Sequence, residues 1–152
     1  MIERLNQNKM IDIMEFIYET PDKFFDFYIT KDRNRIFINK LDILKSLLKT
    51  QECYGLFDEG WKGLLILYYE KGFRKYVKFL AKNLDNAEKL IRYLLWNHSE
   101  ELYAKLKKDN PIVSLLLNKG FISLGDRGRE ILLIKPYIKF RNQRGNYDKY
   151  NN

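Results

Sequence analysis

The segment Tyr76-Val-Lys-Phe-Leu-Ala-Lys82 begins the part of the chain that decides the fold. Its odd-numbered and even-numbered side chains would point to opposite faces of a sheet, as expected of a half-buried strand. A helix pattern follows from Asp85 to His98, where apolar residues recur at spacings of three and four and form one apolar stripe. Alternation returns from Glu100 to Lys108, so the order strand, helix, strand is predicted for residues 76–108.

Short motifs predict where the helices begin and end. Asp85 and Glu88 form a capping box, which predicts that the first helix begins at Asp85. Asn110 followed by Pro111 is a typical N-cap and first helical residue, so a second helix should begin there. This helix should end at Gly120, because glycine readily takes the left-handed conformation that follows a helix.

Further elements are predicted on both sides of this segment. A hairpin with its turn at Gly125-Asp-Arg-Gly128 should lead into a buried last strand, Ile131-Leu-Leu-Ile134. The patterns upstream predict a strand, two helices and two more strands, at Met10–Tyr18, from Thr20, from Asn39, at Glu52–Phe57 and at Gly63–Glu70. This mixture of strands and helices predicts an α+β fold.

The composition is that of one compact domain. With 152 residues, of which 45% are hydrophobic and 15% aromatic, the chain can bury about 70% of the surface that it exposes when unfolded. We expect a single domain over residues 1–141 and a flexible basic tail over residues 142–152. The sequence indicates no oligomeric state.

Cysteine and histidine are too few for a disulfide or a metal cluster. Cys53 is the only cysteine and His98 the only histidine, so no metal site is predicted, and Cys53 is expected to be a buried core residue in a reducing compartment. His98 continues the apolar stripe at the end of the predicted helix, which favours a structural role over one as a base. No segment reads as a signal peptide or a membrane span, so a cytoplasmic protein without membrane association is expected.

Positive charge is concentrated in parts of the chain, which carries a net charge of +8. Residues 71–82 contain no acid and several cations, namely Lys71, Arg74, Lys75, Lys78 and Lys82. Clusters of this kind attract phosphates on nucleotides, on CoA or on nucleic acid. An ordinary solvated face is the alternative, so an anionic partner such as nucleic acid along residues 71–82 is a hypothesis.

The order of the predicted elements and one motif resemble the GNAT-like N-acetyltransferase superfamily. In that superfamily, three consecutive strands precede a helix that receives the CoA diphosphate, and a later strand ends in an Asn before a helix closed by Gly-Phe. Here Asn110-Pro-Ile-Val-Ser-Leu-Leu-Leu-Asn-Lys-Gly-Phe121 matches the second part at its usual length. The resemblance covers most of the chain. It implies a GNAT-like acyl-CoA N-acyltransferase fold, with a mixed, mostly antiparallel sheet, helices on both faces and a sheet splayed open beside residues 80–83.

The resemblance also implies an activity and a set of site residues. The activity would be transfer of an acyl group from acyl-CoA, with acetyl-CoA as the cofactor, to an amine of a small molecule or a protein. Main-chain groups at the end of the strand 76–82 would bind pantetheine, and Asn110 would orient cofactor or acceptor. The implied cofactor-binding residues are Leu80, Ala81, Lys82, Asn83, Asn86 and Asn110.

Departures from the superfamily pattern bear on the activity. The diphosphate loop should contain glycines that let main-chain amides approach the phosphates, but Asn83-Leu-Asp-Asn-Ala87 has none. The carboxylates of Asp85 and Glu88 would repel a diphosphate by about 1 to 4 kcal/mol at a separation of about 4 Å, which weakens CoA binding without forbidding it. Leu116 stands where many members have a Tyr that protonates the leaving thiolate.

Other side chains could take over proton transfer. Tyr69, Glu70 and Tyr103 are the candidate catalytic residues, because a general acid or base needs only reach and a suitable pKa. For the two tyrosines, packing with the hydroxyl group at the surface is the structural alternative.

Two other functions stay open. The chain could be a non-catalytic GNAT-fold binding protein that has lost its diphosphate-binding loop. It could also be a basic winged-helix nucleic-acid-binding module, in which Asn110–Ile134 forms the last helix and the wing. Residues 100–108 would then be helical, with Glu101 and Lys105 as a stabilising pair. The strands predicted at 54–57 and 64–82 have no place in such a module.

Overall fold

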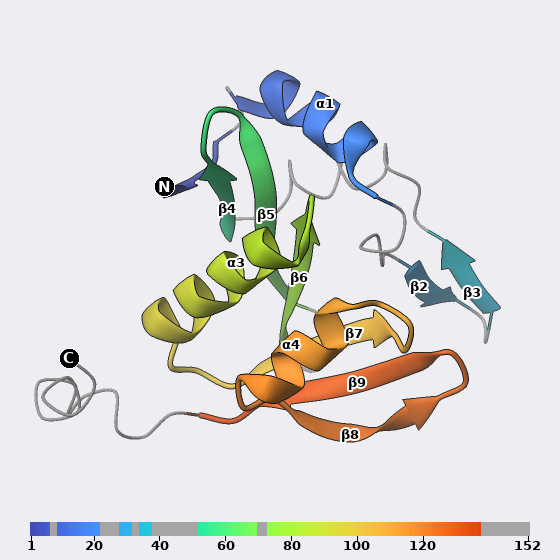
Figure 1. Cartoon of the computed structure of the whole chain (residues 1–152). Coiled ribbons are helices and arrows are strands. Elements are labelled where there is room, and N and C mark those ends of the chain that lie inside the picture. Colours follow the sequence, from blue (N-terminus) through green and yellow to red (C-terminus); the bar gives the residue numbers. More distant parts are fainter. Residues whose placement is uncertain (7–8, 22–27, 32–33, 38–51, 70–72, 138–152) are drawn as a thin grey trace, which may run out of the picture.

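The computed structural model describes residues 1–6, 9–21, 28–31, 34–37, 52–69 and 73–137 of the chain (Figure 1). The strands are β1 (Ile2–Arg4), β2 (Tyr28–Lys31), β3 (Asn34–Phe37), β4 (Glu52–Phe57), β5 (Trp61–Tyr69), β6 (Lys75–Ala81), β7 (Leu102–Lys107), β8 (Ile122–Arg127) and β9 (Glu130–Lys135). The helices are α1 (Met10–Glu19), α3 (Leu84–Asn97) and α4 (Ile112–Asn118). A seven-stranded sheet has the order β1-β4-β5-β6-β7-β9-β8, and β2 and β3 form a separate hairpin.

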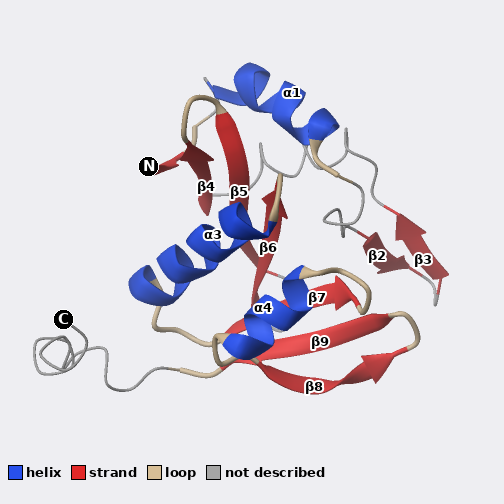
Figure 2. Ribbon diagram, viewed as in Figure 1, coloured by secondary structure: helices blue, strands red, loops and turns tan. Residues whose placement is uncertain are grey.

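Helices cover both faces of the large sheet. α3 and α4 lie in front of the strands in Figure 2, and their residues Leu90 and Leu116 belong to one buried cluster with Leu65 of β5. Ile17 of α1 belongs to a second cluster with Leu64, the neighbouring residue of β5. Because β5 is buried on both faces, its sequence is apolar almost without interruption. The predicted α+β fold with helices on both faces is confirmed.

The segment that decides the fold follows its prediction closely. β6, α3 and β7 begin and end within two residues of the predicted ranges 76–82, 85–98 and 100–108. Gly120 follows α4 with a φ of 104°, the left-handed conformation expected at the end of that helix. Since residues 102–107 form a strand, the winged-helix alternative, which required a helix there, is wrong.

The strand predicted at Met10–Tyr18 is wrong, because residues 10–19 form the helix α1. Ile13, Phe16 and Ile17 stand at spacings of three and four and are buried against the sheet. None of the described helices has the length and apolar character needed to cross a membrane. The helices predicted to follow Thr20 and Asn39, and the tail 142–152, lie outside the described residues.

Two details at the edges of the sheet differ from the prediction. Gly125 lies within β8 at an irregularity in its pairing with β9, and the chain turns between Arg127 and Glu130 instead. Gly125 has a φ of 131° and Gly128 a φ of 65°, conformations that glycine adopts without strain. The edge strand β1, at Ile2–Arg4, was not predicted.

Gly63 lets α3 approach the sheet beside the end of β6. A Cβ atom on Gly63 would lie 2.7 Å from Cδ1 of Leu90 in α3 and 3.1 Å from the main-chain oxygen of Leu80. Gly63 pairs with Ala81, the last residue of β6. A glycine in β5 therefore sets the position of the first turns of α3 relative to the end of β6.

Candidate functional site

β6 and β7 pair at one end and then separate, as Figure 1 shows. The register between these two described strands holds one pair, Tyr76 with Tyr103. The next pair of a continued parallel ladder would be Lys78 with Lys105. Instead, the side chain of Lys78 donates a hydrogen bond from Nζ to the main-chain oxygen of Lys105, over 2.6 Å. The predicted separation of strands near residues 80–83 is therefore present, and Lys78 marks where it begins.

The hydrogen bonds of the neighbouring ladder show which main-chain groups of β6 face β7. The amide of Lys82 donates to the oxygen of Lys62 over 3.1 Å, in register with the pairing of β5 and β6. In an antiparallel pair, hydrogen-bonded and non-hydrogen-bonded positions alternate, so Leu80 also bonds to β5. The N–H and C=O groups of Phe79 and Ala81 are consequently directed toward β7.

This geometry changes the set of main-chain groups expected to meet pantetheine. Ala81 faces β7 as expected, whereas the main chain of Leu80 is paired with Leu64 and its side chain is fully buried. Phe79, which the sequence did not single out, faces β7 instead. The alternation of β6 is visible in the sequence, but its sequence alone does not reveal which edge bonds to β5.

The N-terminus of α3 is capped by Asn83. The side-chain oxygen of Asn83 accepts a hydrogen bond from the amide of Asn86 over 2.9 Å, and its main-chain oxygen accepts from Ala87 over 3.1 Å. The prediction that a capping box of Asp85 and Glu88 begins the helix is therefore wrong. Asp85 lies within the first turn of α3, where the helix dipole favours a negative charge.

The lysines near the start of α3 and the acidic residue Glu88 take part in ion pairs. Lys82 binds Glu19 of α1 over 3.1 Å. Glu88 binds Arg92 over 2.9 Å and Lys119 over 3.2 Å. The hydrogen bond from Lys119, together with the charge of Arg92, lowers the pKa of Glu88. A diphosphate at this helix end would have to compete with Glu19 and Glu88 for these cations.

Asn110 lies just before α4 and holds the start of that helix. It is 3% exposed, and its side-chain oxygen accepts a hydrogen bond from the amide of Ile112 over 2.9 Å. This is the capping role expected of an Asn before Pro111. Leu116, which the resemblance assigned to the position of the superfamily tyrosine, is fully buried in the core.

The candidate catalytic tyrosines lie on opposite faces of the sheet. Tyr69 continues the alternation of Leu65 and Leu67 on the face of α3, and its side chain is 68% exposed. Tyr103 lies on the other face, where its ring contacts that of Tyr76 at 5.5 Å between centroids. The structure therefore does not bring Tyr69 and Tyr103 together, and Glu70 lies outside the described residues.

Tyr103 has a defined polar partner. Its hydroxyl donates to Oε1 of Glu101 over 2.6 Å, and this hydrogen bond, with a contribution from burial, raises the pKa of Tyr103. The guanidinium of Arg74 lies over the ring, 4.9 Å from its centroid. Tyr103 is thus held in its protonated form next to a carboxylate.

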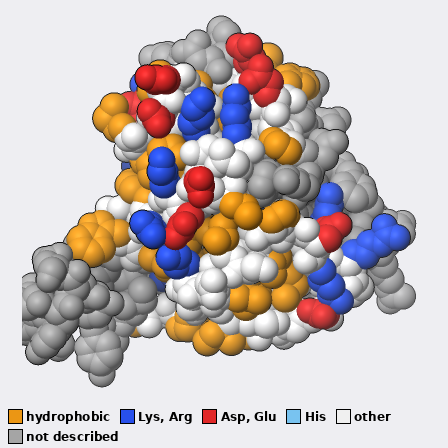
Figure 3. Space-filling model, in the orientation of Figure 1, with side chains coloured by type: hydrophobic (Ala, Val, Ile, Leu, Met, Phe, Trp, Pro, Cys, Tyr) orange, Lys and Arg blue, Asp and Glu red, His pale blue; other side chains and the backbone are white. Residues whose placement is uncertain are grey.

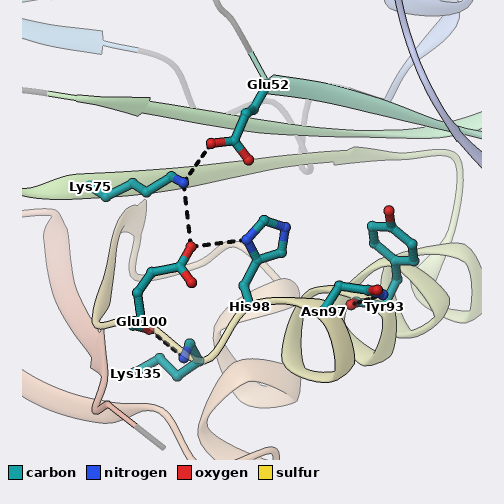
Figure 4. Close-up of polar contacts among 7 residues, drawn as sticks. All are labelled: Glu52, Lys75, Tyr93, Asn97, His98, Glu100 and Lys135. Carbon is teal, nitrogen blue, oxygen red and sulfur yellow. Dashed lines mark hydrogen bonds and ion pairs between the residues drawn. The ribbon is translucent and has the colours of Figure 1, made fainter.

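A polar network lies at the paired end of β6 and β7, away from Phe79 and Ala81 (Figure 4). Oε1 of Glu100 is hydrogen-bonded to Nδ1 of His98 over 2.9 Å, and the same oxygen binds Nζ of Lys75 over 3.3 Å. Lys75 also binds Glu52 of β4 over 2.6 Å. Lys135 of β9, which is 2% exposed, donates from Nζ to the main-chain oxygen of Glu100 over 2.5 Å. The network connects β4, β6, β9 and the end of α3.

The charges of this network stabilise one another. Partial burial opposes the charge of Lys75, but the hydrogen bond and charge of Glu52 outweigh it and raise the pKa of Lys75. Burial likewise opposes the charge of Glu100, but its main-chain hydrogen bond and His98 outweigh it and lower the pKa of Glu100. His98 is 9% exposed and paired, which agrees with the structural role expected of it.

The described cations of the basic run at residues 71–82 are largely engaged within the protein, whereas Lys71 lies outside the described residues. Arg74 stacks on Tyr103, Lys75 binds two carboxylates, and Lys78 is buried. On the face shown in Figure 3, lysines and arginines stand among acidic side chains and do not form one uniform positive patch. Among the described residues, no group of His, Cys, Asp and Glu is placed to hold a metal ion.

Comparisons with known proteins bear on the fold. No family model matches the sequence, and no curated protein matches it. Solved structures do match. An N-acetyltransferase from Staphylococcus aureus Mu50 is 16% identical, with a TM-score of 0.66 over 91% of this chain and 98% of the other. A GNAT-family acetyltransferase from Bacillus cereus ATCC 10987 is 13% identical, with a TM-score of 0.66 over 91% and 98%.

A third similar structure is the GNAT domain of PAT from S. lividans, which is 8% identical, with a TM-score of 0.67 over 88% of both chains. These similarities extend over almost the whole of each chain. At such low identities the similarity concerns the fold alone. The chain therefore has the fold of the GNAT N-acetyltransferases.

Proposed function

We propose that this chain transfers an acyl group from an acyl-CoA-type thioester to an amine acceptor. The observation that carries this proposal is the separation of β6 from β7, with the main-chain groups of Phe79 and Ala81 directed into it. The GNAT fold supports acyl transfer as the general reaction. Acyl-CoA would supply an activated acyl group on a pantetheine arm that contains two amides.

Main-chain groups of a strand edge can bind such an arm in the way that they bind another strand. Phe79 and Ala81 each offer one donor and one acceptor along β6. In a continued ladder the amide of Phe79 would bond to the oxygen of Lys105, but Lys78 bonds to that oxygen instead. The Phe79 amide is therefore the first donor beyond the paired end, and a donor aimed at a thioester oxygen would stabilise the charge that develops on it.

For proton transfer we propose Tyr103 with its partner Glu101. In the reaction, the amine nitrogen bonds to the acyl carbon, the carbon–sulfur bond breaks, one proton leaves nitrogen and the thiolate gains one. Tyr103 lies at the paired end of β6 and β7, where its ring contacts that of Tyr76, and it is hydrogen-bonded to a carboxylate that can accept a proton. Tyr69 lies on the other face of the sheet. We therefore rank Tyr69 and Glu70 as weaker candidates than Tyr103.

Calorimetric titration with acetyl-CoA, followed by measurement of thiol release in a panel of amines, tests this function. We expect a dissociation constant between about 1 μM and 1 mM, the usual range for enzyme substrates, and thiol release that depends on the amine. Absence of binding at about 1 mM, the upper end of that range, would contradict the proposal.

A non-catalytic protein of the same fold is the second candidate. The observation that favours it is Leu116, which is fully buried and has no proton to donate where many members of the superfamily have a tyrosine. This second function would be identified if acetyl-CoA binds but no thiol is released with any of the amines, and if the Tyr103→Phe variant binds acetyl-CoA with the same dissociation constant.

A further inference from the structure

We infer that this chain recognises its acyl donor through the pantetheine arm and gains little affinity from the nucleotide, so that acyl-pantetheine thioesters with and without the nucleotide are equivalent donors. The inference rests on the proposed function and names its substrate class. It follows from a contrast between two neighbouring parts of the site. The edge of β6 offers uncharged main-chain groups, whereas the start of α3 has a capping side chain, a carboxylate in its first turn and no glycine.

The main-chain amides at the start of α3 are already used in part. A helix N-terminus binds phosphate through amides that have no partner within the helix. In α3, the amide of Asn86 bonds to the side chain of Asn83, whereas the bond of Ala87 to the main-chain oxygen of Asn83 is the first ordinary bond of the helix. A diphosphate would have to displace the side chain of Asn83 to reach the amide of Asn86.

The side chains of this turn also obstruct a diphosphate. Residues 82–88 contain no glycine, so each position carries a Cβ atom where close approach of phosphate needs none. Leu84 is exposed, and Asp85 adds a carboxylate in the first turn. Repulsion between Asp85 and a phosphate weakens binding by about fivefold or more at a separation of about 4 Å.

The cations nearby compensate little for this repulsion. Lys82 is paired with Glu19, and Lys119 with Glu88. Each would have to exchange a carboxylate for a phosphate, which replaces one ion pair by another and gains little. The main-chain groups of Phe79 and Ala81 are uncharged and lie on β6, so binding of the arm does not depend on these ion pairs.

The test compares CoA and pantetheine as ligands of the full chain by calorimetric titration. We expect dissociation constants that agree within about threefold, a difference of less than 1 kcal/mol. CoA binding that is about thirtyfold or more tighter than pantetheine binding would overturn the inference and leave the proposed function intact. Absence of binding by both ligands would contradict the proposed function itself, so the two failures are distinguishable.

Two matched variants test the electrostatic cause. Asp85→Asn removes one negative charge from the first turn of α3 and should tighten CoA binding by about fivefold or more without changing pantetheine binding. Glu15→Gln removes one negative charge from the exposed side of α1 and should change neither constant. Unchanged CoA binding in a folded Asp85→Asn variant, with circular dichroism as the check of folding, would overturn the argument from charge.

Discussion

The ammonium group of Lys78 donates a hydrogen bond to the main-chain oxygen of Lys105, 2.6 Å away, where the ladder between β6 and β7 stops. Lys78 is 8% exposed, so this bond is made away from bulk water. A side chain of β6 thus satisfies an acceptor that a main-chain amide of β6 would satisfy in an uninterrupted parallel ladder.

Replacement of Lys78 by methionine should destabilise the fold. The substitution keeps the length of the side chain but leaves the oxygen of Lys105 without this donor, which costs about 1 to 3 kcal/mol for a buried acceptor. Urea unfolding followed by circular dichroism measures the difference. Lys89→Met, which removes an exposed lysine of α3, is the control and should have little effect. Equal stability of both variants would show that the Lys78 bond is dispensable.

Hydrogen exchange should reveal the direction of the main-chain groups of β6. The amides of Lys78 and Leu80 bond to β5, while those of Phe79 and Ala81 face β7 beyond the paired end. We expect the second pair of amides to exchange at least about tenfold faster, because amides held in a ladder exchange only after local opening. Residue-resolved exchange measured by NMR tests this, and the reverse alternation would invalidate the proposed binding edge.

Asn83→Ala should destabilise the protein more than Asp85→Ala. Loss of the N-cap hydrogen bond to Asn86 costs about 1 kcal/mol, whereas Asp85 makes no cap in the structure. Thermal unfolding of the two variants gives the comparison. Asn83→Asp keeps an oxygen acceptor and should restore most of the loss. A larger loss in Asp85→Ala would instead support the capping box expected from the sequence.

Acid should weaken the fold through Glu100. Its pKa is lower in the folded protein than the ordinary value of 4.5, so between the two values the unfolded state binds more protons and stability rises with pH. The contribution of Glu100 is present above its unfolded pKa and is lost as pH falls through its folded pKa. Glu100→Gln should therefore flatten the fall in stability below about pH 4.5, whereas Glu15→Gln should leave it steep. Urea midpoints measured across this pH range show whether the dependence of stability on pH is flattened or stays steep.

Cys53 should resist thiol reagents in the folded protein. Burial raises the pKa of Cys53 to about 12, which reduces the reactive thiolate at neutral pH by about a thousandfold relative to an exposed thiol. Alkylation by iodoacetamide should be slow in buffer and fast in urea. Tyr69→Cys in a Cys53→Ala background places a thiol at an exposed position and provides the reactive control. Rapid modification of native Cys53 would contradict its burial.

The C-terminal part of the fold was predictable because local signals agree there. Alternation in β6, the apolar stripe of α3 and the Asn110 and Gly120 caps of α4 all point to the observed elements. α1 was predicted as a strand because its residues are largely apolar. Packing of Ile13 and Ile17 against the sheet decides in favour of the helix, and such packing is tertiary information.

The candidate site was predictable in place but not in detail. The end of β6 was expected to offer main-chain groups, yet the choice of Phe79 over Leu80 depends on register with β5. The network of Glu52, Lys75 and Glu100 escaped prediction because its members come from elements far apart in the chain. A capping box and an N-cap two residues earlier are both compatible with the sequence, and only the observed hydrogen bond from Asn86 distinguishes them.

The parallel neighbours β6 and β7 divide the sheet into two antiparallel blocks, β1-β4-β5-β6 and β7-β9-β8. Within the described residues, one main-chain rung joins the blocks, at Tyr76 and Tyr103. A slight rotation of one block about that rung would change the width of the separation while every antiparallel ladder stays intact. Such a rotation would stretch the buried hydrogen bond from Lys78 to Lys105 and shift the core that both blocks share, so these contacts, and not a main-chain ladder, hold the width of the separation.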